Sequence, residues 1–197
     1  DVTYDGSAQA PANAGTYAVA VTINDANYEG NASDTLTIGK ATASVTLGDL
    51  SQTYDGSAKS ASTATTPESL AVDLTYDGSS TAPSNAGTYP VVATINDANY
   101  AGSTSGDLVI GKAAAQVVLG DLSQTYNGSA KVASATTTPE GLNVGLTYDG
   151  SSTAPSNAGT YPVVATIINA NYQGSASDTL VIGKAMATVT LGDLSQT

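Results

Sequence analysis

Hydrophobic and polar residues alternate along this chain in short runs, each bounded by Gly, Asn, Asp or Pro. The clearest runs are 70–76, with an apolar side chain at every second position, and 87–95. Alternation with a period of two is typical of a strand with one buried face. No longer stretch has the apolar spacing of a helix. Within residues 41–112 the pattern predicts strands at 44–47, 50–54, 58–63, 70–76, 87–95 and 107–110, and a turn at 66–69.

This pattern of strands recurs along the chain at a fixed interval. Tyr54 recurs as Tyr126, and residues 41–112 align with residues 113–184 without a gap and with roughly three quarters of positions identical. Self-similarity with a period of about 72 residues indicates tandem structural units. We divide the chain into the back part of an incomplete repeat (1–40), two complete repeats (41–112 and 113–184) and the first strand of a further repeat (185–197). We expect this window to be part of a longer array.

The spacing of strands and turns predicts an all-β fold. Short strands separated by Gly, Asn and Pro at close intervals are typical of a small β-sandwich or barrel-like domain. Consecutive repeats join at Gly111-Lys112-Ala113, which leaves almost no linker. Domains joined this tightly do not tumble independently, so we expect a semi-rigid array in which each repeat adds roughly 30–40 Å.

Composition argues against several classes of function. The chain has 17 acidic residues, five lysines, no arginine and a net charge of -12, whereas nucleic acids and anionic membranes are bound by clustered cations. It has no cysteine and no histidine, so nucleophile–histidine pairs and thiolate sites are absent. The carboxylate pairs considered for catalysis are Asp77 with Asp73 or with Glu68, and the first is lost in the next repeat, where Gly145 replaces Asp73. We expect no enzyme, no nucleic-acid partner and no membrane insertion in this segment.

Calcium is the one cofactor that the acidic residues suggest, because Ca²⁺ prefers oxygen ligands. The candidate ligands near the repeat boundary are Asp49, its copies Asp121 and Asp193, and Asp97. Asp97 becomes Asn169 in the next repeat, and no calcium-loop spacing occurs. We therefore predict no cofactor, with calcium as the alternative. Isopeptide crosslinks from the recurring lysines are a second open alternative. These lysines are Lys40, Lys59, Lys112, Lys131 and Lys184.

One recurring segment resembles part of the immunoglobulin fold. Residues 85–89 read Asn-Ala-Gly-Thr-Tyr and lead into the longest predicted strand. This segment is similar to the entry of the F strand in immunoglobulin-like domains, where a tyrosine hydroxyl bonds backbone upstream. The resemblance implies structural roles for Tyr17, Tyr89 and Tyr161 and for Gly15, Gly87 and Gly159. It favours an immunoglobulin-like sandwich. The repeat is short for that fold, so a β-grasp-like module is the alternative.

The whole repeat resembles the MBG and YDG-type repeats of large bacterial surface proteins. The order of motifs is L-S-Q-T-Y-[DN]-G-S-A-K, L-T-Y-D-G-S, N-A-G-T-Y, A-N-Y-x-G and L-V-I-G-K-A. The resemblance implies a non-catalytic repeat in the stalk of an adhesin on the bacterial cell surface, contacting the neighbouring repeats. Two alternatives stay open. The repeats themselves bind glycan or a host protein through loops 79–86 and 96–102, or the chains self-associate by strand exchange into a filament.

Overall fold

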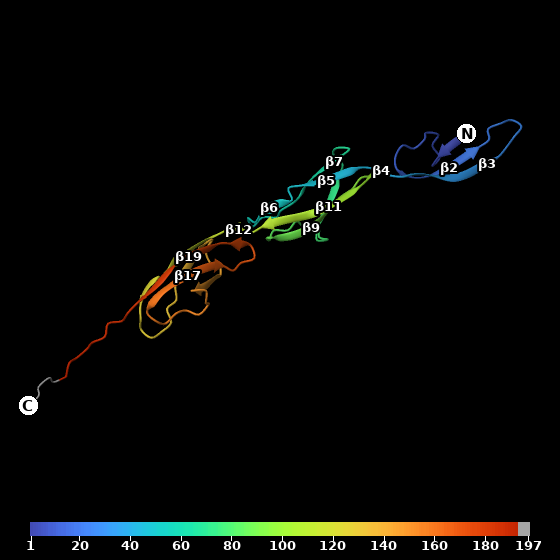
Figure 1. Cartoon of the computed structure of the whole chain (residues 1–197). Coiled ribbons are helices and arrows are strands. Elements are labelled where there is room, and N and C mark those ends of the chain that lie inside the picture. Colours follow the sequence, from blue (N-terminus) through green and yellow to red (C-terminus); the bar gives the residue numbers. More distant parts are fainter. Residues whose placement is uncertain (193–197) are drawn as a thin grey trace, which may run out of the picture. The chain divides into compact units, whose positions relative to one another are not determined.

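The structure is a computed structural model that describes residues 1–192, and every regular element in this range is a strand (Figure 1). The predicted all-β fold with tandem modules is therefore confirmed. No helix within these residues has the length and apolarity needed to cross a bilayer, and none is available to pack on a β-grasp sheet. The chain divides into two compact units. Unit 1 comprises Asp1–Gln52 and Gly56–Ile110, and unit 2 comprises Thr53–Asp55 and the chain from Gly111 onward.

Unit 1 contains most of the first complete repeat, which folds as two packed layers of strands. Its strands are β4 (Ala41–Thr42), β5 (Ser44–Gly48), β6 (Ser51–Thr53), β7 (Ser62–Thr66), β8 (Val72–Tyr76), β9 (Gly87–Ile95), β10 (Tyr100–Ala101) and β11 (Ser103–Gly111). A four-stranded sheet has the order β6-β11-β9-β8, while β5 pairs with β7 and β10 pairs in parallel with β4. Two layers are required because each sheet is apolar on only one face.

The core of this repeat lies between the two layers. Ala43 and Val45 at the start of the repeat pack against Ala93 and Ile95 of β9, and all four are buried. The alternation within β9 accounts for this burial, since Val91, Ala93 and Ile95 face inward while the residues between them are exposed. Half-buried side chains from β5, β8, β10 and the loop before β8 close the cluster. They are Leu47, Leu70, Val72, Leu74 and Tyr100.

Unit 2 repeats this arrangement. Its strands are β12 (Ala113–Ala114), β13 (Gln116–Gly120), β14 (Ser123–Thr125), β15 (Ser134–Thr138), β16 (Val144–Tyr148), β17 (Gly159–Ile167), β18 (Tyr172–Gln173) and β19 (Ser175–Gly183). The four-stranded sheet has the order β14-β19-β17-β16, and β14 runs parallel to β19. The buried core consists of Ala133, Tyr148, Val163, Leu180 and Ile182. Residues 185–192 form no strand, and residues 193–197 lie outside the described part of the chain. The strand at 185–197 stays a prediction.

Residues 1–40 of unit 1 form a three-stranded sheet in the order β1-β2-β3. Its strands are β1 (Val2–Tyr4), β2 (Gly15–Thr22) and β3 (Asn31–Ile38). The register is that of the complete repeats, since Tyr17 pairs with Leu36 as Tyr89 pairs with Leu108. Burial differs, because Leu36 is 36% exposed whereas Leu108 is fully buried.

The predicted strands overlap the observed ones with two differences. The closing strand, predicted at 107–110, is longer and spans Ser103–Gly111. The other difference is the strand placed over 58–63. That prediction is wrong, because β7 occupies Ser62–Thr66 instead. The backbone N–H of Lys59 donates to the Pro83 carbonyl, and that of Ala61 donates to the Tyr76 hydroxyl. Because the N–H groups of Lys59 and Ala61 are bonded outside the β5–β7 ladder, Ser62 is the first residue that pairs with β5.

Candidate functional site

The recurring Gly-Thr-Tyr segment forms a local clasp at the start of the long strand of each repeat. The hydroxyl of Tyr17 donates to the Asn13 carbonyl at 2.8 Å, and that of Tyr89 donates to the Asn85 carbonyl at 3.0 Å. Tyr161 makes the same bond to Asn157 at 3.1 Å. The ring lies directly over the glycine two residues earlier, which is Gly15, Gly87 or Gly159. A Cβ at Gly87 would lie 3.2 Å from the Tyr89 hydroxyl oxygen, so glycine gives the ring room to turn back.

A second tyrosine, in the strand before the clasp, lies deeper in each complete repeat. Tyr76 is 4% exposed, and its hydroxyl accepts the Ala61 N–H at 3.0 Å and lies 2.7 Å from Ser60 Oγ. Tyr148 accepts the Ala133 N–H in the same way. The sequence predicts a core role for Tyr76, which lies on the apolar face of its strand, but it did not predict the hydrogen bond from the Ala61 N–H to the hydroxyl. The available signal was its position just before the Asp77-Gly78 turn.

In unit 1, loop 96–102, which contains the second A-N-Y-x-G motif, binds the first residues of the repeat 41–112. Asn99 and Ala101 accept backbone hydrogen bonds from Ala41 (2.8 Å) and Ala43 (2.9 Å). Gly102 lies against the Ala43 carbonyl so closely that an added Cβ would collide with that oxygen. The loop thus holds β4 against the repeat through these hydrogen bonds, and position 102 requires a glycine.

The same loop also contacts the repeat that precedes it within unit 1. The Oδ1 of Asn99 accepts the Ala14 N–H at 2.8 Å, and its Nδ2 donates to Asn13 Oδ1 at 3.2 Å. Lys40 Nζ donates to the Asp97 carbonyl at 2.6 Å. Loop 96–102 and the Asn-Ala-Gly-Thr-Tyr clasp of residues 1–40 therefore form one joint, which we call the repeat joint.

Unit 2 contains counterparts of the lysine contact and of the backbone bond made by Ala41. Lys112 Nζ donates to the Asn169 carbonyl at 2.7 Å, and the Ala113 N–H donates to the Asn171 carbonyl at 2.9 Å. The segment Thr53–Asp55, which the sequence assigns to the preceding repeat, belongs to this unit. The ring of Tyr54 packs edge-on against that of Tyr172, with centroids 5.3 Å apart at 81°. Edge-to-face aromatic pairs of this geometry contribute about 0.5–1.5 kcal/mol.

The predicted calcium ligands do not gather into one cluster. Asp97 Oδ1 accepts the backbone N–H groups of Asn99 and Tyr100 at 2.7 and 3.0 Å, so this carboxylate shapes its own loop. Asp49 and Asp121 are exposed residues with positive φ, and Asp193 lies outside the described residues. Among residues 1–192, no three acidic, histidine or cysteine side chains lie close enough together to hold a metal ion.

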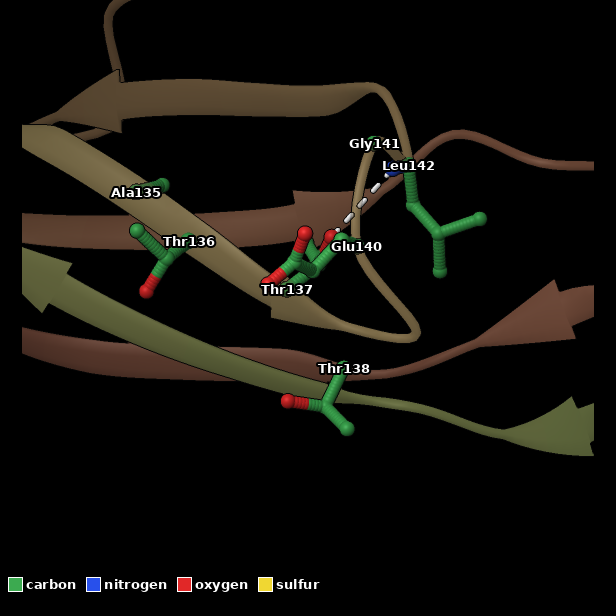
Figure 2. Close-up of a pocket in the computed structure, with 7 residues that line it drawn as sticks. All are labelled: Ala135, Thr136, Thr137, Thr138, Glu140, Gly141 and Leu142. Carbon is green, nitrogen blue, oxygen red and sulfur yellow. Dashed lines mark hydrogen bonds between the residues drawn. The ribbon is translucent and has the colours of Figure 1, made fainter.

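A shallow pocket recurs at the turn between β7 and β8 in the first complete repeat and between β15 and β16 in the second. In unit 2 it has a volume of about 420 Å³ and is lined by Ala135, Thr136, Thr137, Thr138, Glu140, Gly141 and Leu142. Figure 2 shows the Thr137 hydroxyl accepting the Leu142 N–H, and this bond measures 3.2 Å. In unit 1 the pocket of about 460 Å³ is lined by the corresponding residues. Glu140 and its copy Glu68 are the only charged groups in the two linings.

Comparison with known proteins gives a family for the repeats. A family model described as the MBG domain matches residues 1–42, 43–114 and 115–186. The second and third matches start at equivalent positions of consecutive repeats, and the three together cover nearly the whole chain. No curated protein matches the chain.

Proposed function

Because the chain belongs to the MBG domain family, we propose that it is a non-catalytic part of the extracellular stalk of a bacterial adhesin. In this role the repeats hold a distal binding region away from the cell surface. The repeats themselves carry no chemistry. Each one supplies a small core, a contact with the repeat before it and a contact with the repeat after it, as in other linear arrays.

The observation that carries this proposal is the recurrence of the contacts at the repeat joint. Lys40 and Lys112 end their sequence repeats and donate to equivalent carbonyls, at Asp97 and Asn169. A lysine that ends two consecutive repeats and bonds the loop of the following repeat in both cases stabilises the junction between repeats. Semi-rigid coupling of this kind is what a stalk needs, since flexibly linked domains do not hold a fixed separation.

Small-angle X-ray scattering on a series of arrays tests the stalk proposal. The arrays are lengthened by additional copies of residues 41–112, and the control inserts a flexible Gly-Ser linker between Lys112 and Ala113. We expect the maximum dimension to grow by a constant step of roughly 30–40 Å per added copy. The linker control should grow by smaller and decreasing steps. Equal growth in both series would refute mechanical coupling through the joint.

A second candidate function is binding of a small polar ligand by the pocket at the Thr-Pro turn. The pocket recurs at equivalent positions in both complete repeats, and its threonine hydroxyls and carboxylate suit the hydroxyl groups of a glycan. Its lining includes no residue of loops 79–86 and 96–102, which the sequence suggested for binding. A glycan array probed with the whole chain tests this candidate, with E140Q and E68Q combined as the matched control. Glycan binding that these substitutions abolish would favour binding over a stalk role.

A further inference from the structure

The opening and closing segments of the second complete repeat pair with each other in the same direction. β12 pairs in parallel with β18, and β14 pairs in parallel with β19. Between these two pairings, β13 pairs with β15 in the other layer. The opening segment 113–126 therefore accompanies the closing segment 171–183 from its beginning to its end. We call this pair of segments the end clamp.

Backbone hydrogen bonds join the two segments of the end clamp at both of its ends. The N–H groups donate to carbonyls of the opposite segment over 2.8–2.9 Å. They run from Ala113 to Asn171, from Ala115 to Gln173, from Val181 to Leu122 and from Tyr126 to Gly183. Bonds in a parallel pair are evenly spaced along the strands, so a force directed along the strands acts on them together.

A recurring glutamine holds the short strand β14 to the rest of its repeat. Gln124 lies at the centre of this strand, and its Nε2 donates to the Asp121 carbonyl at 2.8 Å and to the Val132 carbonyl at 2.9 Å. β14 is therefore bonded to β19 through its backbone and to the segment before β15 through its side chain. These contacts oppose the removal of β14 from the sheet.

The first complete repeat has the same features within unit 1. β4 pairs in parallel with β10, and the Val109 N–H donates to the Leu50 carbonyl at 2.8 Å. Gln52 Nε2 donates to the carbonyls of Asp49 and Ser60, both at 2.9 Å. The end clamp is thus a property of the repeat.

We propose that the end clamp makes each complete repeat resistant to tension. Tension along an array enters the second complete repeat at Ala113 and leaves it at Lys184, which are opposite ends of the parallel pair. It therefore pulls one segment along the other, and the bonds of the clamp share the load. Segments pulled apart from one end would instead lose their bonds one after another. The inference rests on the proposed stalk function for the source of the tension.

Single-molecule force spectroscopy with two attachment geometries tests the clamp. The chain has no cysteine, so a pair of introduced cysteines in the whole chain fixes where the force acts. A114C with K184C loads the clamp along its strands. T125C with K184C pulls the segments apart from one end, because Thr125 lies opposite Gly183. All three replaced side chains are exposed, so neither pair of substitutions alters the core.

At the same loading rate, we expect the repeat to unfold at a higher force in the A114C and K184C geometry. The unfolding step is recognised by its length, which is about 3.3–3.6 Å for each residue released between the attachment points. Equal forces in the two geometries, or a lower force along the strands, would overturn the proposal.

Two proline substitutions separate the clamp from general stability. V181P removes the N–H that bonds Leu122 across the clamp, and I168P removes the N–H that bonds Asn143 beside β16 and β17. Both bonds measure 2.8 Å. Val181 is 46% exposed and Ile168 is 64% exposed, so neither change empties the core. Each should lower the melting temperature of the repeat, because each removes one backbone donor.

Forced unfolding depends on the unfolding rate rather than on equilibrium stability. Of the two prolines, only V181P should lower the unfolding force between positions 114 and 184. An equal loss of force in V181P and I168P would contradict the clamp. The comparison of the two geometries uses neither proline, so it decides the matter if V181P does not fold.

The clamp and the stalk fail in different experiments. Equal forces in the two geometries, together with constant growth of the array in scattering, would remove the clamp and leave the stalk. A higher force along the strands, without constant growth, would remove the stalk and leave the clamp.

Discussion

The contact between Gly102 and the Ala43 carbonyl gives the sharpest test of how a repeat holds its first strand. The substitution Gly102→Ala adds one methyl group at a point where the backbone oxygen of Ala43 already lies too close for a Cβ. The Ala43 carbonyl is part of the backbone, so it cannot rotate away from the added methyl group as a side chain could. Either β4 must move off β10, or Gly102, which lies between β10 and β11, must shift. Gly30→Ala is the matched control, since the same motif in residues 1–40 has only the flexible Ile23 side chain nearby.

The size of the effect follows from what the methyl group displaces. Overpacking a tight site costs typically about 1–3 kcal/mol. Moving β4 away also weakens the bonds from Ala41 and Ala43 to the loop, each of which contributes about 1 kcal/mol. We expect Gly102→Ala to lower the free energy of unfolding of residues 41–112 by about 2–4 kcal/mol in total. Gly30→Ala should leave stability unchanged or raise it by up to about 1 kcal/mol, because it restricts the unfolded chain.

Calorimetry and hydrogen exchange measure the two variants in the whole chain. For a domain of this size, each 1 kcal/mol shifts the melting temperature by about 4–8 °C, so Gly102→Ala should produce an early transition at least about 8 °C below the original. The Ala41 and Ala43 amides should exchange faster in this variant. Gly174→Ala should repeat the effect in unit 2, through Ala115. Equal melting of Gly102→Ala and Gly30→Ala would refute the steric argument.

Three further predictions address the tyrosines, the repeat joint and the calcium alternative. Tyr76→Phe should lower the free energy of unfolding by about 1–3 kcal/mol, because it leaves the buried Ala61 N–H without an acceptor, whereas Tyr89→Phe should lower it by only about 1 kcal/mol. Thermal unfolding measures both losses, and equal losses would contradict the difference in burial between the two tyrosines. Asn99→Ala should speed hydrogen exchange at the Ala14 amide in residues 1–40 and leave residues 113–184 unchanged. Adding EDTA at low salt should leave the melting temperature unchanged, whereas a fall would indicate a bound cation.

Much of the fold was predictable from the sequence, because the strands carry strong local signals. The strand at 87–95 was predicted with its observed bounds, since its alternation is regular and Gly and Asn flank it. The Asp77-Gly78 dipeptide, which follows the predicted strand at 70–76, forms a tight turn. Both residues have positive φ, at 48° and 80°, and Tyr76 and Ser79 pair across the turn, as in the tight hairpins that favour Asp-Gly.

The elements that sequence reasoning missed are those whose pairing is long-range. β4 and β10 are very short and pair in parallel across most of the repeat, so neither has an alternation to detect. β7 has a threonine-rich sequence with little apolar signal. Its first residue depends on two distant acceptors, the Pro83 carbonyl and the Tyr76 hydroxyl, which bind the N–H groups of Lys59 and Ala61. The repeat joint was missed for the same reason. Asn99 bonds Ala14, which lies 85 positions away, and no local pattern records this contact.

Differences between the copies show what the joint requires. Asp97 is replaced by Asn169 one repeat later, yet the Oδ1 atom of each accepts the N–H groups two and three residues ahead. Asp25 accepts the same pair of bonds in residues 1–40. The position therefore needs a side-chain oxygen that shapes the loop, and it does not need a charge. A calcium site at this loop would depend on that charge, because calcium affinity rises with the number of charged ligands. The loop instead presents backbone carbonyls to the preceding lysine, so the repeat joint is completed by the chain itself.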